Sequence, residues 1–261
     1  AHFNLGGIYN QLNQLNKSIN SLNKTLAINP DFFEANNALG KIYQEIGKHS
    51  EAITEFTKVL KHNSDSAEVH YNLAFSYNYI GKKNLAIEHY EKCIKLNPNS
   101  IVAQNNLGKI YQNTGKHNLA ATYFEKVIEL DPTYAEAYNN LGSVLHTLGQ
   151  LDDAIDYYET SISLTPDSIT LNNLGVALQE TGKIDKAIQT FQKAIIQNPE
   201  SADSYHYLSY LSDLSKSDVI IQKMKQIHSN QKLKLSERSV ICLALAKVYE
   251  TIGNLENFFK Y

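Results

Sequence analysis

The side chains that could perform chemistry do not form a recognisable catalytic or metal-binding motif. The sequence has nine histidines, but no two are spaced as His-x3-His and no carboxylate cluster accompanies them. His49 and His117 occupy one position of a repeating pattern, and His2 and His70 occupy another, so repetition explains both pairs. The run Gly115-Lys116-His117 resembles a phosphate loop but lacks Ser or Thr after Lys. We therefore expect no catalytic residue, no metal ion and no cofactor.

Composition limits the class of partner and the compartment. The chain has 24 Lys and Arg against 27 Asp and Glu, a net charge of −3, and Arg238 is its single arginine. Nucleic acid is a disfavoured partner, because phosphate and guanine recognition depend heavily on arginine. Cys93 and Cys242 form no CxxC pair and no disulfide framework, so a reducing, cytoplasmic location is predicted. Cys93 is expected to be an inert buried thiol. No apolar run approaches the roughly 20 residues of a membrane span, so no membrane insertion is expected.

Proline and glycine recur with a period of about 34 residues, which is the signature of a repeat architecture. The five prolines are separated by 68, 34, 34 and 33 residues. Ten of the twelve glycines fall into two registers that lie seven residues apart. The prolines are Pro30, Pro98, Pro132, Pro166 and Pro199; the registers are Gly6, Gly40, Gly108, Gly142 and Gly175, then Gly47, Gly81, Gly115, Gly149 and Gly182.

Each repeat is expected to contain two helices. Apolar residues follow a helical period before Gly115 and again before Pro132. Glycine at the second register suits the left-handed residue that ends the first helix, and proline at the boundary cannot continue the second. Glycine at the first register and a recurring alanine such as Ala120 lack bulk, so the two helices can approach closely there.

These residues resemble the tetratricopeptide repeat family. The fourth repeat carries the family pattern as Leu107, Gly108, Tyr111, Ala120, Phe124 and Pro132. The resemblance implies an all-α fold, a superhelical solenoid of antiparallel helix pairs. Six repeats of about 34 residues are predicted in residues 1–201, and residues 202–261 are predicted to hold a divergent seventh repeat and an incomplete final helical hairpin. The pattern is broken by Ser64, by Ala74 and by a residue missing near Ser168.

The last 60 residues are less regular. Tyr205 and Leu208 indicate a seventh first helix, followed by an irregular stretch around Lys216. Residues 225–238 are expected to link two helices. The final residues Phe258, Phe259 and Tyr261 would leave an aromatic end exposed, so we expect another segment or another chain to cover it.

The segment from Leu243 to Gly253 is similar to the join in bacterial proteins whose tetratricopeptide repeats precede a sulfotransferase-like domain. Two classes of function follow. In the first, the chain is a scaffold that binds an extended polypeptide or partner protein and has no enzymatic activity. In the second, it is the substrate-recruiting arm of a larger sulfotransferase-like or glycosyltransferase-like enzyme, whose catalytic domain lies beyond Tyr261.

Family resemblance implies that positions five, six, nine, twelve and thirteen of each repeat face a concave groove. Position six carries a recurring asparagine and position twelve a recurring amide, so two amide ladders are expected to hold a peptide backbone. A similar asparagine ladder occurs in the repeats of O-linked N-acetylglucosamine transferases. The alternative is that asparagine is simply common at position six. The ladder residues are Asn72, Asn106, Asn140 and Asn173 at position six, and Asn78 and Gln112 at position twelve.

An aromatic stripe is predicted in the third repeat. Tyr71, Phe75 and Tyr79 stand at i, i+4 and i+8, so they share one helix face that the family register places in the groove. Lys41 and Lys109 hold the position of Phe75 in the preceding and following repeats. The stripe predicts a ligand with an apolar or aromatic side chain beside an acidic one. The alternative is that these rings pack on neighbouring helices.

Overall fold

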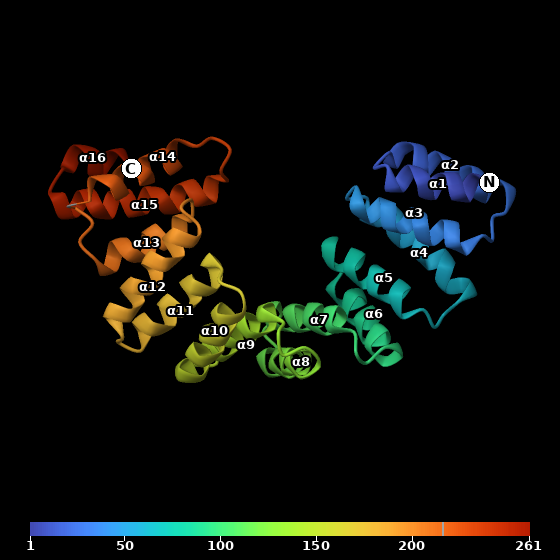
Figure 1. Cartoon of the computed structure of the whole chain (residues 1–261), viewed down its shortest axis with the longest axis horizontal. Helices are drawn as coiled ribbons and strands as arrows, with labels where there is room; N and C mark the ends of the chain where they lie inside the picture. The colour runs from blue at the N-terminus through green and yellow to red at the C-terminus, as the bar shows by residue number, and fades with distance from the viewer. Residues whose placement is uncertain (216) are drawn as a thin grey trace. The chain divides into compact units, whose positions relative to one another are not determined.

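The computed structural model describes residues 1–215 and 217–261, and Lys216 of the expected irregular stretch lies outside the described residues. All regular secondary structure in these ranges is helical (Figure 1). The helices are α1 (His2–Gln11), α2 (Leu15–Ile28), α3 (Phe33–Glu45), α4 (His49–His62), α5 (Ala67–Tyr79), α6 (Lys83–Leu96), α7 (Ile101–Asn113), α8 (His117–Leu130), α9 (Ala135–Thr147), α10 (Leu151–Leu164), α11 (Ser168–Glu180), α12 (Ile184–Gln197), α13 (Ala202–Leu211), α14 (Asp218–Ser229), α15 (Leu235–Ile252) and α16 (Leu255–Lys260).

The glycines of the second register end the first helix of their hairpins, as predicted. Gly115 has φ of 75°, a left-handed conformation that costs a residue without Cβ little. The N–H of Lys116 then donates to the carbonyl of Tyr111 at 2.9 Å, which closes the helix end. In the first repeat the same place is taken by Asn13 with φ of 54°, the only non-glycine with positive φ among the described residues.

The glycines of the first register allow the two helices of a hairpin to touch. A Cβ at Gly108 would lie 2.7 Å from the ring of Phe124, and one at Gly175 would lie 2.5 Å from the ring of Phe191. Ala120 and Phe124 are fully buried at this crossing. The close-packing role that the sequence predicted for these positions is confirmed.

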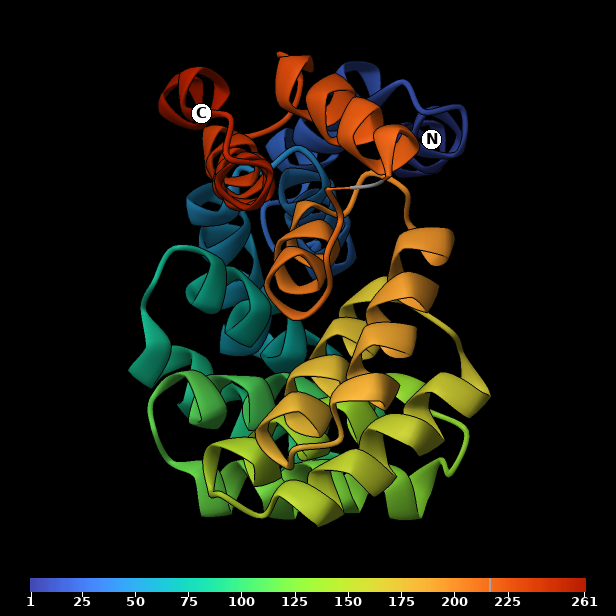
Figure 2. The ribbon, with the colours of Figure 1, turned by 90° about the vertical axis from the view of Figure 1, so that its left-hand side faces the viewer.

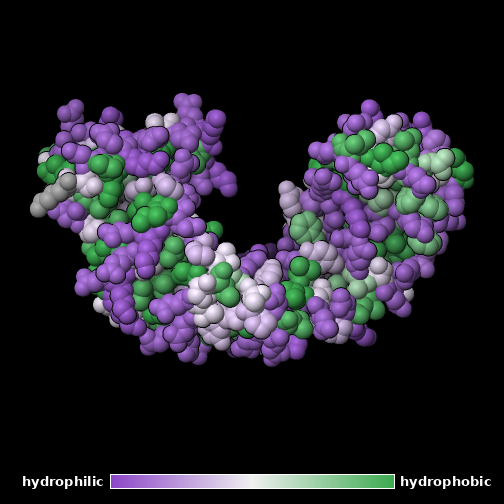
Figure 3. Space-filling view, viewed as in Figure 1, coloured by the Kyte–Doolittle hydropathy of each residue, from purple (hydrophilic) through white to green (hydrophobic). Residues whose placement is uncertain are grey.

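The chain divides into two compact units, of which unit 1 comprises Ala1–Lys126. Within it each hairpin buries its apolar face against the next, in the manner of a repeat protein. Its interior includes a cluster of buried side chains around Leu22, Leu39 and Ile42 and another around Phe56 and Leu73. Figure 3 shows hydrophobic side chains gathered over α1 and α2 at the start of this unit.

Unit 2 comprises Val127–Tyr261 and contains one hydrophobic cluster that runs from Ala154 to Tyr249. This cluster continues across residue 202, where the predicted regular repeats end, because α13 packs on α12 and on α15. The expected linker over residues 225–238 is wrong at both ends, since α14 continues to Ser229 and α15 begins at Leu235. Ile227 explains the difference, because it carries the apolar face of α14 into the core.

The aromatic residues at the end of the chain differ from one another. Phe258 and Tyr261 pack against the core of unit 2, where the ring of Tyr261 stacks on Tyr249 with centroids 5.9 Å apart. Phe259 remains 80% exposed. The expected exposed end is therefore reduced to one ring, because α16 folds back along the end of α15 (Figure 2).

In the described part of the chain, no helix has the length and apolarity needed to cross a membrane.

Candidate functional site

Two of the three predicted aromatic residues are exposed on α5. Phe75 is 40% exposed and Tyr79 is 68% exposed. Both lie against His49, the first residue of α4: the ring of Tyr79 stacks on it with centroids 3.8 Å apart, and that of Phe75 lies 5.9 Å away. Burial lowers the pKa of His49 below its usual value, so the neutral ring is favoured. The rings of Phe75 and Tyr79 thus form an aromatic surface that covers the buried, neutral ring of His49.

Tyr71 has a different role from its two neighbours along the helix. Its ring packs edge-on against the buried ring of Tyr90 in α6, with centroids 5.8 Å apart. The Nδ2 of Asn106 donates to its hydroxyl oxygen at 3.3 Å. Burial raises the pKa of Tyr71, opposed by that hydrogen bond. Tyr71 therefore joins α5 to α6 and α7, and most of its ring is not available to a ligand.

The two predicted lysines are exposed on the helices either side of α5. Lys41 forms an ion pair with Glu68 in the first turn of α5, and both side chains are more than half exposed. Exposed pairs of this kind contribute less than about 1 kcal/mol, so an incoming carboxylate can compete with Glu68. Lys109 is exposed on α7. Lys109 holds the same position in its repeat as Lys41 does two repeats earlier, on α3.

The amide ladders are partly used to join neighbouring repeats. Gln44 of α3 donates to the carbonyl of Asn72 and to the hydroxyl of Ser76, both at 2.7 Å. The side chain of Asn72 is buried, and its Nδ2 has no hydrogen-bond partner among the described residues. Asn78 is exposed on α5 and Gln112 is half-buried on α7. The ladder in unit 1 thus divides into structural amides and amides near the surface.

In unit 2 the ladder also includes a contact between repeats. The Nδ2 of Asn173 on α11 donates to the Oδ1 of Asn139 on α9 at 3.0 Å. Asn140 is half-buried on α9.

A cavity of about 320 Å³ lies between α1 and α3, at the N-terminal end of the same face. Two groove positions hold small residues there: Gly7, which has no side chain, at position nine and Ala38, which has only a methyl group, at position six. A Cβ added at Gly7 would meet nothing within 4 Å. Phe3 and Lys41 also line this cavity. Sequence reasoning missed it, although the departure of Gly7 and Ala38 from the repeat pattern was the available signal.

Unit 2 has a counterpart between α11 and α13, a cavity of about 280 Å³ that sequence reasoning also missed. Its lining is aromatic and acidic, with Tyr207, Tyr210 and Glu180. The carboxylate of Glu180 lies 3.1 Å from the Nε2 of His146. The two units also differ in net charge. Residues 1–126 hold thirteen lysines against ten acidic residues, whereas residues 127–261 hold eleven basic residues against seventeen acidic ones.

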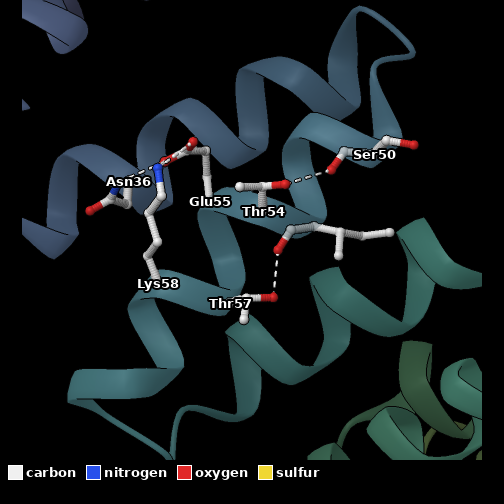
Figure 4. A network of polar contacts seen from close by, with 7 residues as sticks. Asn36, Ser50, Thr54, Glu55, Thr57 and Lys58 are labelled. Atoms are coloured by element: carbon white, nitrogen blue, oxygen red, sulfur yellow. Dashed lines mark hydrogen bonds and ion pairs between the residues drawn. The ribbon is translucent and has the colours of Figure 1, made fainter.

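A polar network fixes the hairpin that carries Lys41 and His49 (Figure 4). The Nδ2 of Asn36 on α3 donates to Glu55 on α4 at 2.6 Å, and the ammonium of Lys58 lies 2.8 Å from the same carboxylate. Thr54 and Thr57 donate to carbonyls one turn earlier in α4. The network joins α3 to α4, so it holds the helix that carries Lys41 against the helix whose first residue is His49.

The cysteine and the potential metal ligands of the described residues form no reactive cluster. Cys93 is buried, and burial raises the pKa of its thiol, which confirms the expectation of a buried thiol. No group of three or more His, Cys, Asp and Glu side chains in the described ranges is arranged to hold a metal ion.

Sequence profiles of the tetratricopeptide repeat match most of the chain. They cover residues 6–47, 33–65, 67–100, 99–167 and 133–195. The chain belongs to the tetratricopeptide repeat family. Its predicted fold class, an all-α solenoid of antiparallel helix pairs, is therefore confirmed by both the matches and the helices.

Solved structures agree with this assignment. MamA is 28% identical, with a TM-score of 0.60 over 61% of this chain and 93% of that one. YrrB, described as a tetratricopeptide repeat protein with an unusual peptide-binding site, is 22% identical, with a TM-score of 0.60 over 69% and 90%. A tetratricopeptide repeat protein from Parabacteroides merdae is 19% identical, with a TM-score of 0.72 over 93% and 97%.

No curated protein matches this sequence. The profile matches end at residue 195, so they do not support the similarity of Leu243–Gly253 to the join that precedes a sulfotransferase-like domain. The tetratricopeptide repeat neighbours support a protein-interaction scaffold.

Proposed function

We propose that this tetratricopeptide repeat protein binds an extended polypeptide along the first helices of unit 1, from α1 to α7. The single observation that carries the proposal is the exposed surface of Phe75 and Tyr79 over His49. Two large rings in water cost free energy unless a partner covers them, and such rings are frequent hot spots of interfaces. Their exposure on α5 favours a binding role.

Charge indicates what lies beside the aromatic contact. Lys41 and Lys109 stand one repeat to either side of Phe75, and unit 1 carries a net charge of +3 from its thirteen lysines and ten acidic residues. A ligand with an aromatic or apolar side chain flanked by a carboxylate would match both features. Because Asn72 is buried and Asn106 is bonded to Tyr71, we assign a backbone contact to Asn78, whose side chain is exposed on α5.

The cavity between α1 and α3 extends the same face. Its volume of about 320 Å³ is at the lower end of the range of ligand pockets, which suits one apolar side chain of a peptide. A peptide would pass from Tyr79 on α5 over Lys41 on α3 to this cavity. No observation favours the enzyme-arm alternative, so the proposal includes no chemistry.

Selection from a random peptide library tests this function. The immobilised chain would be used to select twelve-residue peptides, with the Phe75→Ala, Tyr79→Ala variant as the counter-selection. We expect enriched peptides that place an acidic residue beside an aromatic or aliphatic one. If the wild-type chain enriches the same peptides as the variant, the proposed surface is wrong.

A further inference from the structure

The cavity of about 280 Å³ between α11 and α13 departs from the amide ladder. Tyr207 holds position six of the seventh repeat, counted from Ala202, where Asn140 and Asn173 stand in the two preceding repeats. An aromatic ring thus replaces an amide. The lining residues hold positions nine, twelve and thirteen of the sixth repeat and positions five, six and nine of the seventh: Val176, Gln179, Glu180, His206, Tyr207 and Tyr210. All six belong to unit 2, so the inference below is independent of the peptide contact proposed for unit 1.

Aromatic rings of α13 line one side of this cavity. The ring of Tyr207 stacks on the fully buried ring of Phe191 in α12, with centroids 5.1 Å apart and planes 20° from parallel, so this contact fixes its position. Tyr210 lies three residues further along α13 and is 56% exposed. The ring of His206 stands edge-on to it, with centroids 5.0 Å apart. The faces of such rings carry partial negative charge, which attracts cations.

Glu180 supplies the full negative charge of the cavity. It is the last residue of α11, and 47% of its side chain is exposed. Burial lowers the pKa of His206, opposed by the nearby carboxylate of Asp203, so the neutral imidazole is favoured. The described residues that line the cavity include no lysine or arginine. The site therefore combines one carboxylate with aromatic rings.

The first helices of unit 2 carry the same sign of charge. Within their bounds α9, α11 and α13 contain Glu136, Glu180 and Asp203 but no lysine or arginine. In unit 1, by contrast, α3 and α7 carry Lys41 and Lys109. Eleven basic residues against seventeen acidic ones give residues 127–261 a net charge of −6. A partner for this surface is therefore expected to be positively charged.

We propose that this cavity binds a lysine or arginine side chain of a partner polypeptide. Its volume lies just below the roughly 300 Å³ at which ligand pockets begin, which suits one side chain rather than a whole small molecule. The cation would lie against Tyr207 and Tyr210 and donate hydrogen bonds to the carboxylate of Glu180. Arginine is expected to bind more tightly than lysine, because a planar guanidinium can stack on a ring and donate to both carboxylate oxygens.

Two groups of the chain compete with an incoming cation. The Nζ of Lys247 on α15 lies 5.8 Å from the ring centre of Tyr210, which shows that this ring accepts an ammonium group. Lys247 is paired with Glu250 at 2.7 Å, so its repulsion of a second cation is partly offset. The Nε2 of His146 on α9 lies 3.1 Å from Glu180. Pairs this exposed contribute less than about 1 kcal/mol, so a ligand can share the carboxylate.

Variants of single residues separate this cavity from the overall charge of unit 2. Tyr210→Ser reproduces Ser143, which holds the same position in the fifth repeat. Glu180→Gln removes the charge and keeps the shape of the side chain. Glu200→Gln, an exposed carboxylate between α12 and α13, is the control, because it removes the same charge outside the cavity.

An NMR titration of the whole chain tests the site with capped alanine pentapeptides whose central residue is arginine, lysine, glutamate or citrulline, the uncharged isostere of arginine. We expect the arginine and lysine peptides to shift the ring signals of Tyr207 and Tyr210, and the other two to leave them in place. Affinity for the arginine peptide should fall about fivefold or more in Glu180→Gln and in Tyr210→Ser, and should not change in Glu200→Gln. The Phe75→Ala, Tyr79→Ala variant of unit 1 should bind this peptide as the wild-type chain does.

Three results would overturn the proposal. The first is that the arginine peptide leaves both tyrosine rings unshifted or shifts only other tyrosines. The second is that the citrulline peptide binds as tightly as the arginine peptide. The third is an equal loss in Glu180→Gln and Glu200→Gln, which would mean attraction to the net charge of unit 2 only. The ring signals of the wild-type chain decide even if a variant is poorly folded.

Discussion

Tyr79 of α5 covers His49 of α4, with ring centroids 3.8 Å apart and planes 26° from parallel. One ring is 68% exposed and the other is 4% exposed. The contact joins two consecutive repeats, because His49 starts the second helix of one and Tyr79 ends the first helix of the next. It therefore couples the exposed aromatic surface to the packing between repeats.

Acid should destabilise the folded chain through His49. Burial holds its pKa below the value of about 6.5 that it has when unfolded, so the unfolded state binds more protons as the pH falls. The contribution of the neutral ring to stability is present above pH 6.5 and is lost as the pH falls below it. We expect the melting temperature to decrease from pH 7 to pH 5, and to decrease less in His49→Gln. Thermal melts of both proteins, with His62→Gln as the exposed control, measure this; an equal decrease in all three would exclude His49.

Removal of the exposed rings should weaken ligand binding without unfolding the repeat. Phe75→Ala with Tyr79→Ala is expected to cost about 2 to 4 kcal/mol of affinity for a selected peptide, because aromatic contacts dominate such interfaces. Helicity should stay the same, since neither side chain is part of the buried core. Calorimetry and circular dichroism measure the two quantities.

The control for that experiment is Phe259→Ala, which removes a ring that is 80% exposed from unit 2. Asn140→Ala with Asn173→Ala tests the other amide ladder. If the peptide still binds the ring variant but not the ladder variant, the binding surface lies in unit 2.

The repeat lattice made most of the fold predictable from sequence. Glycine and proline at fixed spacing act locally, so Gly115 and Pro132 mark helix ends whatever the tertiary structure. The lattice ends near residue 202, and there the prediction of a long linker failed, since only the core of unit 2 shows that Ile227 is buried.

The candidate site was predictable from sequence only where the position of a residue around one helix determines whether its side chain is exposed. Phase along α5 was enough to place Phe75 and Tyr79 on one face. The contact with His49 and the bond between Asn106 and Tyr71 depend on how neighbouring repeats pack, which the spacing of residues along one helix does not encode. For the same reason the sequence did not predict the contact between His70 on α5 and His89 on α6, whose Nδ1 atoms lie 2.8 Å apart.

Two glycine-to-alanine substitutions should have opposite effects. A Cβ at Gly108 would lie 2.7 Å from the buried ring of Phe124, so Gly108→Ala is expected to destabilise the chain by about 1 to 3 kcal/mol through overpacking. A Cβ at Gly7 has open space, so Gly7→Ala should stabilise by about 0.5 to 1 kcal/mol through helix propensity. Urea denaturation measures both changes. A stabilising Gly108→Ala would contradict the close approach of α7 and α8.

The turn that ends the first helix gives a final paired test. Gly115 has φ of 75°, and Asn13 holds the equivalent place with φ of 54°. Side chains other than glycine are strained in this conformation, so Gly115→Ala should destabilise by about 1 to 2 kcal/mol. Asn13→Gly should instead stabilise slightly, because asparagine tolerates the conformation better than alanine but less well than glycine. Urea denaturation of the two variants and the wild-type chain measures the difference. A cost for Asn13→Gly as large as that for Gly115→Ala would mean that the side chain of Asn13 contributes more than its backbone conformation.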